Sequence, residues 1–342
     1  MDRKDLIQQI EKSRDSRVIT YLTSDRPGPV NARIGMDIIP IFSEQLRKIG
    51  KTKKIDLFLY STGGDTHVPW RLVSMIREYC ETFSVLIPYK AHSAATMIAL
   101  GADEIVMSDL SELSPIDPST GNIFNPDDPR NPGNKIPISV EDVMAYFDLA
   151  KNKFGVSRDE DLAKVFNKFS EATPQIHPLA LGNINRTHSL IRMLAKRLLQ
   201  SHNVPMPQSD IDSIIDYLTE KLYSHQYYIG RKEAKKDLGI RTVKAASAEL
   251  SDKMTGLYEA YKNEMGLGIN TWSAENELGM NNSTTSKSYK IAFIESIKNS
   301  DNFKIIIELH RQQVMVMQQT PQGTTQLPQQ QVGFRILEQG WK

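Results

Sequence analysis

The apolar positions of the first third of the chain follow two different periods. Four short runs rich in β-branched and aromatic residues predict strands: RVITYLTS (17–24), KIDLFLY (54–60), FSVLIPY (83–89) and EIVMS (104–108). Three intervening runs have the spacing of amphipathic helices: DIIPIFSEQLRKIG, VPWRLVSMIREYC (68–80) and SAATMIALGA (93–102). This alternation predicts an α/β fold with a parallel sheet and right-handed crossovers. The strands lack a polar face, which indicates that helices cover both faces of the sheet.

The remainder of the chain changes character twice. A segment with six prolines (109–137) is expected to be an irregular loop, and helical patterns then dominate from about 139 to 265. After residue 286, YKIAFIES, FKIIIELHRQQVMVM and VGFRILEQGW predict strands. Nine glutamines between 312 and 331 predict a flexible connector. We therefore expect a main domain over 1–285, with a helical extension at about 139–265, and a small β-rich module over 286–342.

Composition and charge exclude several classes of protein. Hydrophobic residues make up 39% and charged residues 24% of the 342, the balance of a soluble globular protein. A net charge of +1 argues against nucleic acid as the main partner. The single cysteine excludes an internal disulfide and a cysteine-based zinc cluster, and His177 and His188 have no ligand-type neighbours, so no metal is expected. No apolar run approaches the ~20 residues of a membrane span, and the charged N-terminus lacks a signal-peptide core. We expect a cytoplasmic protein without a membrane span or a cofactor.

Two turns meet at the carboxyl end of the predicted parallel strands, where α/β proteins place their sites. One is STGGD after the strand at 54–60, and the other begins at Ser93. The first N–H groups of a helix are unpaired, so Ser93 and Ala94 would lie among free donors, and the N–H groups of Gly63 and Gly64 could approach from the other side. A hydroxyl between two sets of donors suits acyl transfer, in which each donor contributes roughly 3–4 kcal/mol. A serine at a helix start is also the ordinary N-cap, and no complete phosphate-binding fingerprint is present, so the residues alone leave both interpretations open.

Longer motifs carry a resemblance. DLFLYSTGGD followed by AHSAATMIALGADEIVMSDLSELSPIDP resembles the Clp protease/crotonase superfamily, and within it the serine dehydrogenase proteinases, which are related to signal peptide peptidase A. IHPLALG and YIGRKEAKKDLGI extend the resemblance over roughly residues 4 to 300. It implies a layered, Clp/crotonase-like spiral of βαβ units, assembled as a homo-oligomer such as a trimer, a hexamer or a larger ring.

The resemblance also implies an activity and a set of roles. The activity is serine-dependent hydrolysis of peptides or unfolded proteins. Ser93 falls at the nucleophile position, Ala94 at the following oxyanion donor, and Gly63 with Gly64 at the opposing donor. Despite the word dehydrogenase in the family name, no dinucleotide site is predicted.

The general base is left open by the sequence. Clp-type peptidases carry a histidine shortly after the serine, whereas here that neighbourhood reads SPIDPS. Relatives of signal peptide peptidase A use a lysine, which points to Lys135 in NPGNKIPIS; a lysine that acts as a base must be desolvated enough to lower its pKa. His225 in YSHQYYIGRKEA is the second candidate, and Asp117 in SPIDP could orient a base or shape the pocket. His92 adjoins the nucleophile, but adjacent side chains at a strand end usually diverge.

Three functions compete at this point. The leading one is a serine peptidase that forms an acyl-enzyme on Ser93. The second is a catalytically silent scaffold of the same fold, which binds a partner through its oligomer surfaces and C-terminal strands. The third is an acyl-CoA enzyme of the crotonase type, which is disfavoured because that chemistry needs no serine at residue 93.

Overall fold

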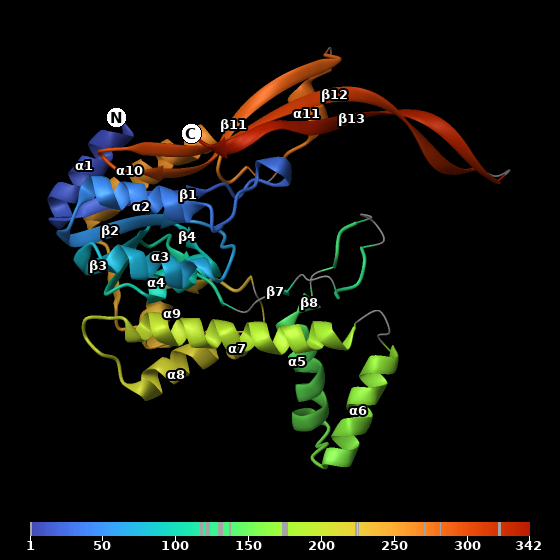
Figure 1. Cartoon of the computed structure of the whole chain (residues 1–342), viewed down its shortest axis with the longest axis horizontal. Helices are drawn as coiled ribbons and strands as arrows, with labels where there is room; N and C mark the ends of the chain where they lie inside the picture. The colour runs from blue at the N-terminus through green and yellow to red at the C-terminus, as the bar shows by residue number, and fades with distance from the viewer. Residues whose placement is uncertain are drawn as a thin grey trace.

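One long mixed sheet organises the chain (Figure 1). The computed structural model describes residues 2–116, 119–120, 124–128, 133–136, 138–172, 177–222, 224, 226–269, 271–280, 282–320 and 323–342. Within them, eight strands pair in the order β10-β5-β3-β2-β1-β11-β12-β13. Their bounds are Val243–Ala245 (β10), Glu104–Met107 (β5), Cys80–Ile87 (β3), Thr52–Tyr60 (β2), Arg17–Thr23 (β1), Thr284–Glu295 (β11), Ser300–Thr320 (β12) and Gly323–Trp341 (β13). The strands from β10 to β1 are parallel, as predicted for β2, β3 and β5, and the last three are antiparallel. The strand β10 was not predicted.

Helices cover both faces of the parallel part of the sheet. One face packs against α1 (Arg3–Arg14) and α10 (Ala248–Met265). The other face packs against three helices: α2 (Ile38–Ile49), α3 (Val68–Arg77) and α4 (Ala94–Leu100). Outside these lie α7 (Pro178–Gln200) and α8 (Gln208–Asp216), with α7 against α3 and α4.

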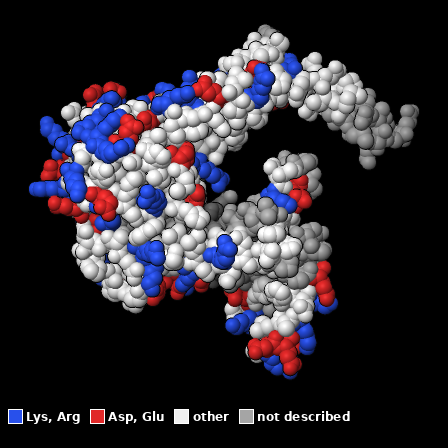
Figure 2. All heavy atoms as spheres, in the orientation of Figure 1, with Lys and Arg blue, Asp and Glu red and all other residues white. Residues whose placement is uncertain are grey.

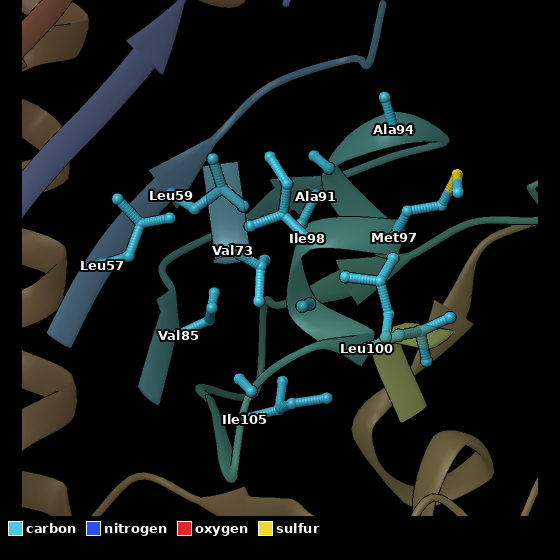
Figure 3. Packing of buried hydrophobic residues seen from close by; sticks show 14 of the residues in the cluster. Leu57, Leu59, Val73, Val85, Ala91, Ala94, Met97, Ile98, Leu100 and Ile105 are labelled. Carbon is cyan, nitrogen blue, oxygen red and sulfur yellow. The ribbon is translucent and has the colours of Figure 1, made fainter. Parts of the chain in front are cut away.

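Alternate residues of each central strand enter two different cores, and both cores are apolar. On β2, Leu57 and Leu59 belong to the core beneath α2, α3 and α4, whereas Phe58 and Tyr60 belong to the core beneath α1 and α10. All four are fully buried. Figure 3 shows the side chains of α4 beside those of β2, β3 and α3. The missing polar alternation in the sequence is therefore explained by burial on both faces.

A second, small sheet lies beside the start of α4. It is formed by β4 (Lys90–Ala91), β6 (Glu112–Leu113) and β9 (Ile229–Gly230), with β4 and β6 parallel and β9 antiparallel to β6. The segment predicted as an irregular loop thus contributes β6, and also β7 (Ser119–Thr120), which pairs with β8 (Ile138–Ser139). Two residues per strand are too few to leave a periodic signal in the sequence.

The predicted helical extension is present in the described residues. It comprises α5 (Val140–Asp148) continued by a π-helix (Leu149–Lys153), α6 (Asp159–Ala172), α7, α8, a second π-helix (Tyr217–Lys221) and α9 (Arg231–Lys236). In Figure 1, α5 and α6 project away from the sheet. A 3-10 turn (Gly28–Val30) and α11 (Ala274–Leu278) complete the helices of this description.

The prediction of a flexible glutamine-rich connector is wrong. Its described residues lie in β12 and β13, which pair in antiparallel register from Phe303↔Trp341 to Thr320↔Gly323. A glutamine-rich composition is typical of flexible segments, so it predicted a loop. Here the backbone of each strand supplies the hydrogen-bond partners of the other, and this pairing is not visible in composition. β11 pairs with β1, so the strands expected as a C-terminal module continue the main sheet.

Buried charges meet beside the central strands at the end of α1. Asp56 on β2 is fully buried and accepts hydrogen bonds from Arg14 Nε at 2.9 Å and from Ser16 Oγ at 2.8 Å. Arg14 also pairs with Glu104, whose carboxylate lies 2.9 Å from Lys244 Nζ. Burial acts to raise the pKa of Glu104, but hydrogen bonds from Arg14 and Lys244 outweigh it and lower that pKa to about 2.

Removing Arg14 should destabilise the fold. In Arg14→Ala the buried carboxylate of Asp56 loses its nearest cation and keeps only Lys54 Nζ at 4.0 Å, which costs ~3–5 kcal/mol in the free energy of unfolding. Urea unfolding followed by circular dichroism measures this loss. The matched control is Arg17→Ala, because Arg17 pairs with Glu11 but is 55% exposed, and its removal should cost less than ~1 kcal/mol. Equal losses in the two variants would contradict this account.

Glu104 should contribute to stability in a pH-dependent way. Its pKa is about 2 in the folded state against an ordinary value of 4.5, so its stabilising effect is complete above pH 4.5 and is lost as the pH falls towards 2. The difference in unfolding free energy between wild type and Glu104→Gln should therefore shrink over this range. The same substitution at the exposed Glu78, outside this cluster, serves as the control. A constant difference for Glu104→Gln would show that the ion pairs leave its titration unchanged.

Candidate active site

Ser93 lies in a strained turn between β4 and α4. Its φ is 51° and its ψ is −113°, and among the described residues only Asp15, at the C-terminal end of α1, is another non-glycine residue with positive φ. Such a conformation costs about 1–3 kcal/mol and persists only where surrounding contacts enforce it. A sharp strand-to-helix turn is the arrangement by which α/β-hydrolases expose a nucleophilic serine.

The side chain of Ser93 does not cap its helix. Ser93 occupies the N-cap position of α4, yet its hydroxyl makes no capping hydrogen bond. Within the described chain neither this hydroxyl nor the N–H of Ala94 has a hydrogen-bond partner. Ser93 is half-buried and Ala94 is fully buried. A hydroxyl and a backbone donor are thus both available at the same turn, which the ordinary helix-cap interpretation does not explain.

A network of hydroxyl groups supports the turn at Ser93. The N–H of Ser93 donates to Ser114 Oγ at 2.8 Å, and the N–H of Ser114 donates to Thr96 Oγ1 at 3.1 Å. Thr96 Oγ1 in turn donates to the carbonyl of Ala91 at 2.7 Å. The sequence interpretation missed Ser114 and Thr96. The available signal was the position of Ser114 within the LSPIDP motif.

Gly63 packs directly against Ser93. A Cβ on Gly63 would lie 2.8 Å from Ser93 Cβ, 2.9 Å from the carbonyl oxygen of His92 and 3.3 Å from the nitrogen of Ala94. The φ of Gly63 is 98°, a conformation that side-chain-bearing residues rarely adopt. The structure therefore brings together Gly63, Ser93 and Ala94, three of the residues predicted for the site.

The N–H of Gly63 is already engaged. It donates to Ser61 Oγ at 3.1 Å, and Ser61 Oγ also accepts from Thr23 Oγ1 at 2.8 Å. Ser61 further pairs through its backbone with the residues on either side of Ala91. These bonds fix the glycine turn to β1 and β4.

Gly64 is held by a close backbone contact with Ile34. A Cβ on Gly64 would lie 2.2 Å from the carbonyl oxygen of Ile34. The bridge uses the carbonyl of Gly63 and the N–H of Asp65, at 2.9 and 2.8 Å, so the N–H of Gly64 points away from Ile34. In the part of the chain that the structure describes, this N–H meets no acceptor. Gly64 is therefore a freer donor than Gly63.

A titratable pair adjoins the turn. His92 Nε2 lies 3.0 Å from Glu112 Oε1 on β6. Burial raises the pKa of Glu112, and the nearby Lys90 offsets part of this effect. Lys90 itself pairs with Asp25 at 3.1 Å. The side chain of His92 thus contacts the small sheet, a contact that the sequence did not predict.

Among the predicted bases, the structure describes Lys135 alone, and its ion pair is with Asp127. Lys135 is exposed, and its Nζ lies 2.8 Å from Asp127 Oδ1, across a β-bridge between the same two residues. This segment extends away from α4 in Figure 1. His225 and Asp117 lie outside the described residues.

Other chemistry finds less support. Over the described ranges, no group of three or more His, Cys, Asp or Glu side chains could hold a metal ion. Burial raises the pKa of the Cys80 thiol to about 11, so this cysteine remains protonated and weakly nucleophilic. None of the helices in these ranges is both long and apolar enough to cross a membrane.

Comparison with known proteins finds a family model that matches the first part of the chain. Residues 1–153 match the family model described as ClpP-like SDH-type serine proteinase. Two uncharacterized proteins of Methanocaldococcus jannaschii are also similar. One is 24% identical over 193 residues, which are 48% of this chain and 65% of that protein; the other is 30% identical over 129 residues, which are 35% and 43%. The chain spans less than two thirds of the length of either relative.

Three solved structures share distant likeness. A mutant of the 1510-N membrane-bound stomatin-specific protease is 14% identical, covers 74% of this chain and 87% of its own, and has a TM-score of 0.38. The decarboxylase domain of CurF from Lyngbya majuscula is 14% identical with a TM-score of 0.22, covering 54% and 94%. A probable enoyl-CoA hydratase/isomerase from Mycobacterium abscessus is 11% identical with a TM-score of 0.23, covering 72% and 87%. These TM-scores are too low to carry a conclusion.

Ser114 should act by positioning Ser93. In Ser114→Ala the partly buried N–H of Ser93 loses its acceptor, and the turn should relax from its strained geometry. We expect labelling of Ser93 by a serine-reactive phosphonate to slow by about tenfold, with the folded state retained. The matched control is Ser108→Ala, because Ser108 is also buried and hydrogen-bonded through its hydroxyl, to Pro88 and Ser111, but does not contact the turn. Equal slowing in both variants would assign the effect to general destabilisation.

Proposed function

We propose that this chain is a serine peptidase that forms an acyl-enzyme on Ser93, because residues 1–153 match the family model described as ClpP-like SDH-type serine proteinase. The observation that carries the proposal is the strained turn of Ser93. Its hydroxyl makes no capping bond, the N–H of Ala94 is free of partners among the described residues, and Gly63 packs against both residues. The substrates that fit are peptides or unfolded protein segments, whose extended backbone can reach the turn.

The backbone around Ser93 supplies the proposed oxyanion site. Ser93 Oγ attacks the carbonyl carbon of the scissile peptide and forms a C–O bond, while the carbonyl oxygen becomes an oxyanion. The N–H of Ala94 and the N–H of Gly64 or Gly63 donate to this oxygen, each contributing roughly 3–4 kcal/mol to the transition state. Gly64 is the better second donor, because the N–H of Gly63 already donates to Ser61.

A base must take the proton of the hydroxyl and deliver it to the leaving amine. We propose Lys135 for this role, with His225 as the second candidate and Asp117 as a residue that orients the base. Water then attacks the acyl-enzyme, gives its proton to the same base, and releases the carboxylate product and free Ser93. Lys135 can act only when its segment closes over the turn and its contact with Asp127 is exchanged for one with Ser93. If neither Lys135 nor His225 reaches Ser93, the protein is the silent scaffold of the competing hypothesis.

A fluorophosphonate probe tests the nucleophile and the base together. Wild type should be labelled and Ser93→Ala should not, because the probe forms its covalent bond with an activated serine hydroxyl. Lys135→Ala should reduce the labelling rate by at least ~100-fold if the lysine is the base. Peptide mass spectrometry locates the adduct, and hydrolysis of an unstructured casein substrate reports turnover.

Matched variants separate the alternatives. Lys151→Ala removes a lysine from the neighbouring π-helix and should leave labelling unchanged. Loss of labelling with Ser93→Ala but not with Lys135→Ala would transfer the base role to His225, which His225→Ala then checks. Absence of labelling in folded wild type would contradict the peptidase and favour the scaffold.

A further inference from the structure

The outer parts of β12 and β13 form a two-stranded ribbon that leaves the body of the protein. β11 pairs with β12 only as far as Thr284↔His310. Beyond this point β12 and β13 pair only with each other, up to Thr320↔Gly323. In Figure 1 the ribbon extends far from the helices that cover the rest of the sheet. An isolated two-stranded hairpin is at best marginally stable in water, so a ribbon of this length lacks the support that other strands receive.

The ribbon is also unusual in its charge. No Lys, Arg, Asp, Glu or His occurs from residue 312 to 334, although charged residues make up 24% of the whole chain. Figure 2 shows Lys, Arg, Asp and Glu at the base of the arm but none on the described surface beyond it. Natural edge strands are usually protected by charges, by proline or by shortness. Here the edges are long, and the described part has a single such device, Pro328 opposite Met315.

Apolar side chains are exposed along the same surface. Met315 on β12 is 59% exposed, and on β13 Phe334, Ile336 and Leu337 are 44–47% exposed. β13 is the last strand of the sheet, so its outer row of N–H and C=O groups faces no other strand of the described chain. The arm therefore offers backbone partners and apolar contacts on one continuous edge.

We propose that the free edge of β13, with its uncharged ribbon, packs against the same edge of a second copy of this chain. Two β13 strands related by a two-fold axis are antiparallel and present complementary rows of donors and acceptors. Residues 323–334 of β13 carry no charge, so no like charges meet where this part of the strand contacts itself. β13 has 19 residues, which at ~3.4 Å each and a ribbon width of ~10 Å give roughly 650 Å² per copy, close to the ~800 Å² per partner of a standard interface.

The contact is independent of the peptidase chemistry, so its test uses mass rather than activity. Light scattering coupled to size-exclusion chromatography gives the mass of full-length protein. Replacing residues 313–330 with Asn-Gly shortens the ribbon and keeps Gln312 paired with Gln331. The mass of this variant should be half that of wild type, with an unchanged circular dichroism spectrum for the body.

Charge variants identify the occupant. Gln329→Lys with Gln331→Lys, or the same pair changed to Glu, puts one sign of charge on exposed positions of β13. Each variant alone should show the halved mass, and an equimolar mixture of the Lys and Glu proteins should restore the wild-type mass. The control, Gln8→Lys with Gln200→Lys, adds equal charge on exposed positions of α1 and α7 and should leave the mass unchanged. A wild type that is monomeric, a shortened ribbon without effect, or a mixture that stays at half mass would overturn the proposal; capture of an unfolded peptide by a monomeric wild type would assign the edge to substrate instead.

Discussion

The close approach of two backbone segments sets the geometry at the centre of this protein. The glycine turn after β2 can lie against the start of α4 only because residue 63 has no side chain, and a methyl group there would overlap Ser93. The same approach requires a positive φ at Ser93, and the bond from its N–H to Ser114 maintains that strain. The backbone of the glycine turn and the backbone at the start of α4 therefore lie in direct contact. The position of the Ser93 side chain is therefore set by the packing of the backbone around it.

Much of that frame could be predicted from the sequence. Apolar runs predicted β1, β2, β3 and β5, and the intervening helical spacing predicted α2, α3 and α4, because each element is long enough to express its period. The pairing of Gly63 with Ser93 was predicted from the rule that parallel strands end at one edge. The strain of Ser93 and the support from Ser114 could not be predicted. Both depend on tertiary contacts between residues whose local sequence fits many other conformations.

Other errors have a different physical cause. The glutamine-rich strands were mistaken for a flexible connector because their sequence carries no hydrophobic alternation. The strands β4, β6 and β9 were missed because two residues do not make a period. The base stays a prediction, because whether Lys135 reaches Ser93 depends on how a segment closes, and a sequence motif specifies type and spacing but not the path of a loop.

The pairing of β1 with β11 has a consequence for folding during synthesis on the ribosome. β1 forms its parallel pair with β2 early, but its other edge awaits β11, and the hydrogen bond from Thr20 to the carbonyl of Glu295 spans 275 positions. A ribosome adds ~5–20 residues per second, so the ~275 residues that separate β1 from β11 take ~14–55 seconds to synthesise, and the edge of β1 stays open for that time. During that interval the nascent chain carries a half-finished sheet whose open edge can recruit other strands. Efficient production of this protein is therefore expected to depend on keeping neighbouring nascent chains apart, or on a chaperone that covers the edge of β1 until β11 has been synthesised.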